Sequence, residues 1–321
     1  MVPEPAFVER FEADLDPLIA PGARLGIAVS GGPDSLALLL LAAAARPGDI
    51  EAASVDHGLR SGARDEASMV GEICAKLNVP HAILTARWNE LPSTAIQERA
   101  RRERYRLLGY WTEERRLEAL VTAHHADDQA ETVLMRFNRG SGVRGLAGMR
   151  ARSITPGNHV RLLRPLLGWR RTDLERICAD AGVTPVADPS NADERFERVR
   201  IRRSLAHADW LDPSALARSA AYLAEADAAL EWAARLEWAR AVHERRGEIV
   251  YRPDEAPAEI LRRVISRILR KLASEGETEF RGAELDRLLE SLVSGNVSTL
   301  RGVQCTGGRE WRFRPASPRR A

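Results

Sequence analysis

The chain has 321 residues, of which 44% are hydrophobic and 29% are charged, and its formal net charge is +2 at pH 7. This length and composition are typical of a globular protein and favour two domains over one. No apolar run approaches the roughly 18 residues of a membrane-spanning helix, and residues 1–11 lack the apolar core of a signal peptide. We therefore expect a cytoplasmic protein without a membrane partner.

The first 200 residues alternate short aliphatic runs with amphipathic stretches. We predict strands at 24–29, 50–55, 81–85 and 120–123, and helices at 35–45, 64–77 and 94–115. Strands separated by helices of this length are typical of βαβ units and a parallel sheet. Ligands bind beyond the carboxyl ends of the strands in such sheets, which is where Ser30, Asp56 and His124 fall.

The pattern changes after residue 138. Residues 139–148 are rich in glycine and arginine, which predicts a mobile basic loop. A fifth strand is expected at 159–164, and a helix at 171–181 that Gly182 ends.

The sequence from residue 213 onward has a different character. We predict an unusually long Ala/Glu/Arg-rich helix at 214–246, two amphipathic helices at 259–273 and 281–293, and short strands at 297–300 and 310–314. The expected fold is thus an α/β parallel-sheet domain at 1–212, followed at 213–321 by a smaller, mainly helical domain with a short terminal sheet. The long helix would link the two.

The strongest motif is Ser30-Gly31-Gly32-Pro33-Asp34-Ser35, between the first strand and the first helix. Glycines let backbone N–H groups face a ligand, and the helix N-terminus adds amides and a positive dipole end that favour a phosphate. Ser30 and Ser35 supply hydroxyl donors, and Asp34 can hold a Mg²⁺ that bridges phosphates. A P-loop is excluded because no lysine lies within forty residues of this turn. A dinucleotide-binding GxGxxG does not fit the loop either, because Gly31-Gly32 is followed by Pro33 and Asp34.

This SGGxDS loop resembles that of the ATP-pyrophosphatase (PP-loop) superfamily, whose members cleave ATP between the α and β phosphates and transfer AMP to an oxygen. Further segments narrow the resemblance: residues 56–60, 100–105, 124–132 with their continuation to 146, 164–167, 188–191 and 200–202. This ordered set is similar to tRNA(Ile)-lysidine synthetases and covers about residues 24–206. The HHxDDQxET segment at 124–132 is its most specific part.

The resemblance implies an ATP-dependent ligase that forms a carbon–nitrogen bond, with residues 1–212 as its PP-loop catalytic domain and residues 213–321 as a tRNA-binding domain. Its substrates would be free L-lysine and tRNA(Ile) with a CAU anticodon, with ATP and Mg²⁺ as cofactors. ATP would adenylate the C2 oxygen of the wobble cytidine, and the ε-amine of lysine would displace AMP to give lysidine. A homodimer stays open.

Candidate catalytic residues follow the fourth strand. Asp128 and Glu131 are three positions apart on a predicted helix, so they share a face and are expected to bind the cationic lysine. One of these acids, or His125, would take the proton from the amine.

Other residues are expected to handle the nucleotide. Arg101 would neutralise charge on the α-phosphate, and Asp34 with Asp127 would hold Mg²⁺. The rival interpretation of the segment around His124 is a transition-metal site, but consecutive residues point in different directions and the sequence offers no partner cluster. An acid at this helix start also favours capping.

Residues 133–171 contain nine arginines and no acid. Such segregation of charge favours a polyanion partner over a merely solvated basic face. We expect salt-dependent binding of tRNA phosphates by five arginines: Arg139, Arg144, Arg150, Arg200 and Arg202. Val199 stands where the family pattern has an asparagine.

Other functions remain alternatives. A tRNA thiolase usually needs paired or catalytic cysteines, whereas Cys74, Cys178 and Cys305 are isolated and form no CxxC pair. A small-molecule amidating synthetase would not explain the acid-free arginine stretch. A non-catalytic RNA-binding protein on a decayed scaffold is disfavoured because the acids of the predicted site are present.

Overall fold

The computed structural model describes residues 1–58, 63–88, 96–157, 159–186, 195, 197–245, 247–273, 280 and 282–316. Contacts divide the chain into two compact units, Met1–Tyr222 and Leu223–Ala321. The division falls inside helix α9 (Pro213–Ala241), whereas the predicted boundary lies before that helix.

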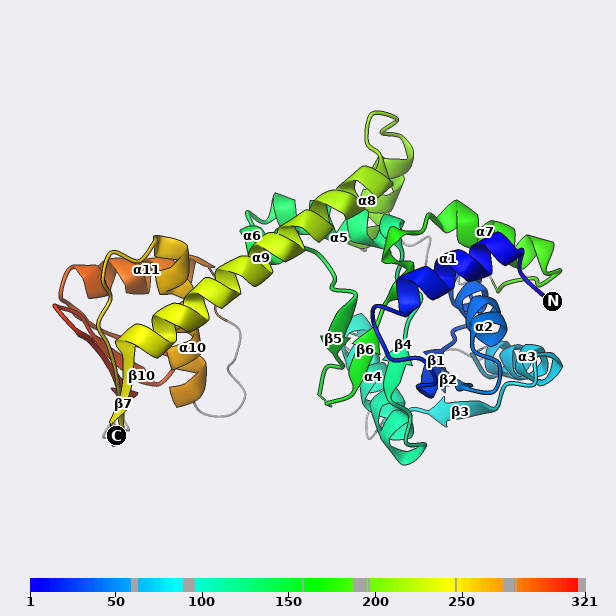
Figure 1. Cartoon of the computed structure of the whole chain (residues 1–321), viewed down its shortest axis with the longest axis horizontal. Helices are drawn as coiled ribbons and strands as arrows, with labels where there is room; N and C mark the ends of the chain where they lie inside the picture. Colours follow the sequence, from blue (N-terminus) through cyan, green and yellow to red (C-terminus); the bar gives the residue numbers. More distant parts are fainter. Residues whose placement is uncertain are drawn as a thin grey trace. The chain divides into compact units, whose positions relative to one another are not determined.

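The first unit is built on a six-stranded sheet with the strand order β3-β2-β1-β4-β6-β5 (Figure 1). Its strands are β1 (Leu25–Ala28), β2 (Ile50–Asp56), β3 (His81–Thr85), β4 (Ala119–Val121), β5 (Arg152–Ile154) and β6 (Arg161–Leu163). All neighbouring pairs are parallel except β5 with β6. The predicted parallel α/β sheet is confirmed, and the short edge strand β5 is an addition to it.

Helices cover both faces of this sheet. They are α1 (Pro5–Leu15), α2 (Pro33–Ala45), α3 (Ala63–Lys76), α4 (Ile96–Glu114), α5 (Ala126–Asn138), α6 (Val143–Leu146), the 3-10 turn η1 (Pro165–Gly168), α7 (Arg171–Asp180) and α8 (Glu197–Ala206). The larger core joins α1, α2, α3 and α7 to one face through β1 residues Leu25 and Ile27. Trp111 of α4 and Leu120 of β4 belong to a second core on the other face. Helices α1 and α8 were not predicted.

The alternation of β1 leaves Gly26 between the two residues that face the larger core. A Cβ at Gly26 would lie 2.6 Å from Cζ3 of the buried Trp111 ring. The close approach of α4 to the central strand therefore requires a glycine at this position.

We expect Gly26→Ala to lower the free energy of unfolding by about 1–3 kcal/mol, because the added methyl group must displace a packed indole. Urea denaturation followed by circular dichroism measures this change. Gly168→Ala is the matched control, since a Cβ there meets no atom within 4 Å. Equal unfolding midpoints for the two variants would contradict the proposed close packing.

The second unit contains an antiparallel sheet with the strand order β7-β8-β11-β10-β9. Its strands are β7 (Val242–Arg245), β8 (Glu248–Tyr251), β9 (Val297–Leu300), β10 (Val303–Thr306) and β11 (Trp311–Pro315). Helices α10 (Ala258–Leu272) and α11 (Gly282–Val293) share a core with the sheet, and Tyr251, Ile265 and Phe313 are buried in it.

The predicted long helix at 214–246 is wrong at its end. Helix α9 stops at Ala241, and the next four residues form β7, in which Val242 pairs with Tyr251 of β8. Pairing with β8 is a tertiary effect that overrides the helical composition of this segment. In the described part of the chain, no helix is both long and apolar enough to cross a membrane.

Candidate active site

The predicted glycine loop joins β1 to α2. Gly31 adopts a φ of +83°, which residues with a side chain rarely adopt. The hydroxyl of Ser35 accepts a hydrogen bond from the Ser30 amide and donates one to the Gly32 carbonyl, each at 3.0 Å. The buried Ser35 hydroxyl thus shapes the loop itself, whereas the sequence predicted that it donates to a phosphate.

Asp34 lies in the first turn of α2, where free backbone amides favour an anion. Its Oδ1 atom is buried and has no hydrogen-bond partner among the described residues. Its Oδ2 atom lies 3.5 Å from Nε2 of His125. A buried carboxylate oxygen without a partner is costly unless a cation or ligand binds it, so this atom fits a cation site.

His125 precedes α5 and is surrounded by carboxylates. Asp34 and Asp128 each have an oxygen 3.5 Å from its Nε2 atom, and Asp127 has one 3.5 Å from its Nδ1 atom. Burial lowers the pKa of His125, but the adjacent carboxylates of Asp127, Asp34 and Asp128 raise this pKa to about 10. An imidazolium cannot accept a proton, so this geometry disfavours His125 as the general base.

Asp127 and Asp34 lie on opposite sides of the His125 ring. The oxygens of Asp127 accept hydrogen bonds from Nη2 of Arg170 at 3.3 Å and from the Arg171 amide at 2.9 Å. Burial raises the pKa of Asp127, but these partners and His125 hold that pKa below its usual range. The sequence predicted that Asp127 and Asp34 share a Mg²⁺. In the structure Asp127 lies by Nδ1 of His125 and Asp34 by Nε2, so the two carboxylates are not placed together for one ion.

His124 and Arg101 form the next part of the site. The Nδ1 atom of His124 lies 2.9 Å from the Thr122 hydroxyl. Burial lowers the pKa of His124 to about 3, with a further lowering from Arg164 and Arg101, so the ring is neutral. The Arg101 guanidinium lies 5.1 Å from the centre of the Tyr105 ring. Arg101 is close enough to lower the pKa of His124, and its contact with the α-phosphate stays a prediction.

Asp128 and Glu131, which we call the acid pair, face one side of α5, and helix α8 covers them. Arg198 Nε lies 2.5 Å from Glu131 Oε2, and Arg198 Nη2 lies 2.5 Å from Asp128 Oδ1. Arg202 Nε lies 2.6 Å from Glu131 Oε1. Glu131 is only 2% exposed. Arg202 therefore pairs with an acid of the protein itself, whereas the sequence predicted contact with a tRNA phosphate.

The sequence did not predict that Arg198 belongs to this site. A signal was present, because Arg198 and Arg202 are one helical turn apart, as are Asp128 and Glu131. Two such pairs are complementary if both segments are helices. Helix α8 at 197–206 was not predicted, so this complementarity was not recognised from the sequence.

The glycine-rich segment after α5 is tied back to that helix and contains α6. The side-chain amide of Gln129 donates to the Met149 carbonyl at 2.8 Å and accepts from the Met149 amide at 2.7 Å. Arg136 donates to the carbonyls of Gly145 and Gly148 at 2.7 and 3.0 Å. The segment predicted as a mobile loop thus has a folded conformation next to the acid pair.

The predicted phosphate-binding arginines are not equivalent. Arg139 pairs with Glu197, and Arg144 is exposed on α6. Arg150 and Arg200 donate to nearby backbone carbonyls at 3.4 and 3.2 Å. Three further arginines of the acid-free stretch make internal contacts: Arg136, Arg164 and Arg170. The nine arginines therefore do not form one basic face.

Parts of the predicted motifs lie outside the described residues, namely 59–60 and 188–191. Asp56 ends β2, and its Oδ1 atom accepts a hydrogen bond from the Gly58 amide at 2.8 Å. Val199, where the resemblance led us to expect an asparagine, is buried.

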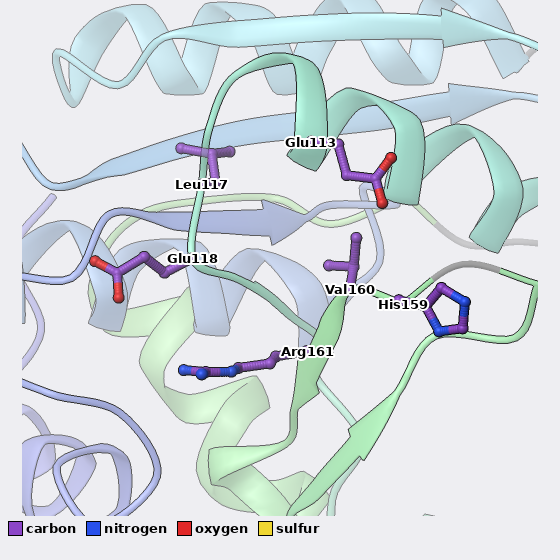
Figure 2. Close-up of a pocket in the computed structure, with 6 residues that line it drawn as sticks. All are labelled: Glu113, Leu117, Glu118, His159, Val160 and Arg161. Atoms are coloured by element: carbon purple, nitrogen blue, oxygen red, sulfur yellow. The ribbon is translucent and has the colours of Figure 1, made fainter.

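A pocket of about 350 Å³ lies at the amino ends of strands β4 and β6, whereas the candidate site lies at the carboxyl ends of the strands. Figure 2 shows the six residues that line it, which are Glu113, Leu117, Glu118, His159, Val160 and Arg161. They belong to the end of α4 and to the starts of β4 and β6, whereas the glycine loop and His125 follow the carboxyl ends of strands. This pocket is separate from the candidate active site.

The described chain matches the PP-loop domain family over residues 4–208. A tRNA(Ile)-lysidine synthase of Novosphingobium aromaticivorans is 48% identical over 314 residues, which cover 97% of this chain and 94% of that protein. The chain belongs to the tRNA(Ile)-lysidine synthase family. Another member, from Zymomonas mobilis, is 44% identical over 300 residues, which cover 92% of this chain and 90% of that one. The family resemblance predicted from the motifs is confirmed.

A solved structure of another enzyme shares the fold of this chain. The U34-tRNA thiolase NcsA from Methanococcus maripaludis, solved with its [4Fe-4S] cluster, matches with a TM-score of 0.56 and 15% identity. The match covers 68% of this chain and 78% of NcsA. At this identity the likeness concerns the fold alone.

Proposed function

We propose that this protein ligates free L-lysine to C2 of the wobble cytidine of tRNA(Ile) with a CAU anticodon, converting ATP to AMP and pyrophosphate. The observation that supports this proposal is that a residue of the predicted phosphate loop and a residue of the acid pair lie close together at the carboxyl ends of the strands. Asp34 of the phosphate loop and Asp128 of the acid pair each lie 3.5 Å from the same atom, Nε2 of His125. Nucleotide and amine would therefore bind side by side.

In the first step, the C2 oxygen of cytidine bonds to the α-phosphorus of ATP, and the bond to the bridging oxygen of pyrophosphate breaks. The glycine loop and the amides of α2 bind the departing phosphates. Arg101 stabilises negative charge that grows on the α-phosphate.

Mg²⁺ would neutralise phosphate charge when bound, and the unpartnered Oδ1 atom of Asp34 fits it. The described residues hold no group of three or more His, Cys, Asp or Glu side chains suited to a metal. An ion that bridges phosphates needs only one or two carboxylates, because it keeps several waters.

In the second step, the ε-amine of lysine bonds to C2, and the bond between C2 and the adenylated oxygen breaks, which releases AMP. Asp128 and Glu131 bind the ammonium form of lysine, and one of them accepts the proton that the amine must lose. The neighbouring imidazolium of His125 helps keep Asp128 ionised: burial raises the pKa of Asp128, but the charges of His125 and Arg198 lower it on balance.

The decisive experiment measures pyrophosphate release from ATP with and without lysine and the CAU-anticodon tRNA transcript. We expect release only when tRNA is present, multiple turnovers only with lysine, and a wobble cytidine heavier by lysine minus water. ATP turnover that ignores lysine would favour another PP-loop enzyme. An absence of any ATP turnover would favour a non-catalytic RNA-binding protein.

A tRNA thiolase is the alternative that the sequence left open. Cys74, Cys178 and Cys305 are all buried, and burial raises the pKa of each thiol to about 12. Thiols with so high a pKa are poor nucleophiles and poor metal ligands. The cysteines therefore support the ligase over the thiolase.

We expect the triple variant Cys74→Ala, Cys178→Ser, Cys305→Ala to form lysidine at a rate within about twofold of the wild type, because buried thiols are chemically inert. Serine at 178 retains a donor for the Pro33 carbonyl, which the Cys178 thiol contacts at 3.3 Å. Mass spectrometry of the tRNA measures the product, and circular dichroism confirms folding. Loss of activity in a folded triple variant would favour thiol chemistry.

A further inference from the structure

The acid pair that the proposed reaction assigns to lysine already holds two cations of the chain itself. Both oxygens of Glu131 accept from guanidinium groups, Oε2 from Arg198 at 2.5 Å and Oε1 from Arg202 at 2.6 Å. Oδ1 of Asp128 accepts from the other side of Arg198 at 2.5 Å. Arg198 thus bridges the two acids, as the ammonium group of a bound lysine would.

A free lysine must compete with these intramolecular partners. It would have to displace Arg198 from Glu131, which is almost fully buried. A buried carboxylate that loses its partner is strongly destabilised. The arginines need no translational entropy to bind, whereas a free amino acid does. The contact with α8 therefore weakens lysine binding.

The same arginines are accessible from outside. The side chains of Arg198 and Arg202 are 38% and 34% exposed, so a phosphate can reach them. Guanidinium groups bind phosphate with paired hydrogen bonds at least as well as they bind carboxylate. Within α8, Val199 is the one fully buried residue, so ion pairs contribute a large share of the contact between this helix and α5.

We propose that Arg198 and Arg202 are positioning residues that close the acid pair to free lysine until phosphates of the bound tRNA draw them away. This inference rests on the proposed function and adds an order to it, in which tRNA binds before lysine. Arg198 is central because it contacts both acids, whereas Arg202 contacts Glu131 alone.

The test is calorimetric titration of L-lysine into the full-length protein with α,β-methylene-ATP, which cannot be cleaved at the reactive bond. Each protein is titrated with and without the CAU-anticodon tRNA transcript. We expect tRNA to lower the lysine Kd of the wild type by about tenfold, within the usual range of coupling between sites. Arg198→Gln without tRNA is expected to bind lysine as tightly as the wild type does with tRNA.

Two further variants separate positioning from a general effect of charge or folding. Arg203→Gln removes the same charge from an exposed position of α8 and should leave the tRNA-free lysine Kd unchanged. Arg198→Lys keeps a cation at the acid pair and should restore part of the dependence on tRNA. A merely structural role of Arg198 would instead weaken lysine binding in the glutamine variant.

Equal lysine affinity of the wild type with and without tRNA would overturn the inference, and this comparison needs no variant to fold. An unchanged tRNA-free Kd in folded Arg198→Gln would overturn it as well. If the wild type forms lysidine while either result holds, only the binding order fails. If the wild type forms no lysidine, the proposed function fails and the inference with it.

Discussion

Asp34→Ala is expected to reduce pyrophosphate release by about a thousandfold, a loss typical of removing one preorganised electrostatic contact to a transition state. Asp34 combines a helix N-terminus with a buried oxygen, Oδ1, that has no hydrogen-bond partner among the described residues, so this oxygen is available to a ligand. The tRNA affinity should stay within about twofold, because we expect arginines elsewhere in the chain to bind the phosphates of the RNA. A coupled pyrophosphate assay and filter binding measure the two quantities.

The matched control for this prediction is Asp65→Ala. Asp65 also lies in the first turn of a helix, α3, but it is exposed and has no place in the candidate site. Its removal should change neither rate nor affinity. A parallel loss of tRNA affinity in Asp34→Ala would contradict the assignment of this carboxylate to the nucleotide.

Asp128→Asn is expected to raise the KM for lysine by about 100-fold, the size of a lost charge-assisted hydrogen bond in a desolvated site. Adenylation of the tRNA should continue, because that step precedes the attack by lysine. The asparagine side chain can still accept from the His125 amide, as Oδ2 of Asp128 does at 3.2 Å, so the start of α5 keeps its cap. Transfer of α-labelled AMP to tRNA without lysine separates the two steps.

Glu175→Gln provides the control, since Glu175 also accepts from an arginine, Arg171 at 2.9 Å, but at the surface of α7. Surface pairs of this kind contribute little, so neither KM nor stability should change measurably. An unchanged KM for lysine in Asp128→Asn, with a reduced rate of adenylation, would move Asp128 from the lysine step to the nucleotide step.

The elements around the phosphate loop were predictable because their signals are local. A buried strand, a glycine turn and an apolar helix follow one another within residues 25–45, and each forms from its own sequence pattern. The position of His125 beyond a strand end followed from the same reasoning. Strand β7 was not predictable in this way, because its four residues extend a helical composition and take their conformation from pairing with β8.

Charge patterns proved less informative than motifs. The acid-free stretch at 133–171 suggested one basic surface, but Arg136, Arg164 and Arg170 fold inward onto backbone carbonyls and acids. A composition counts charges without showing which atoms they face. For the same reason the sequence paired Asp127 with Asp34, although the His125 ring stands between them.

The sequence by itself determined the family, the parallel sheet, the phosphate-binding loop and the acids that follow β4, because each depends on residues close together in the chain. Only the tertiary structure decided which cations those acids meet. Arg198 lies 67 residues from Glu131 and 70 from Asp128, and no local pattern specifies that α8 packs on α5. Ion pairs depend on distances of a few ångströms between helices, which the fold sets and the order of residues along the chain does not show.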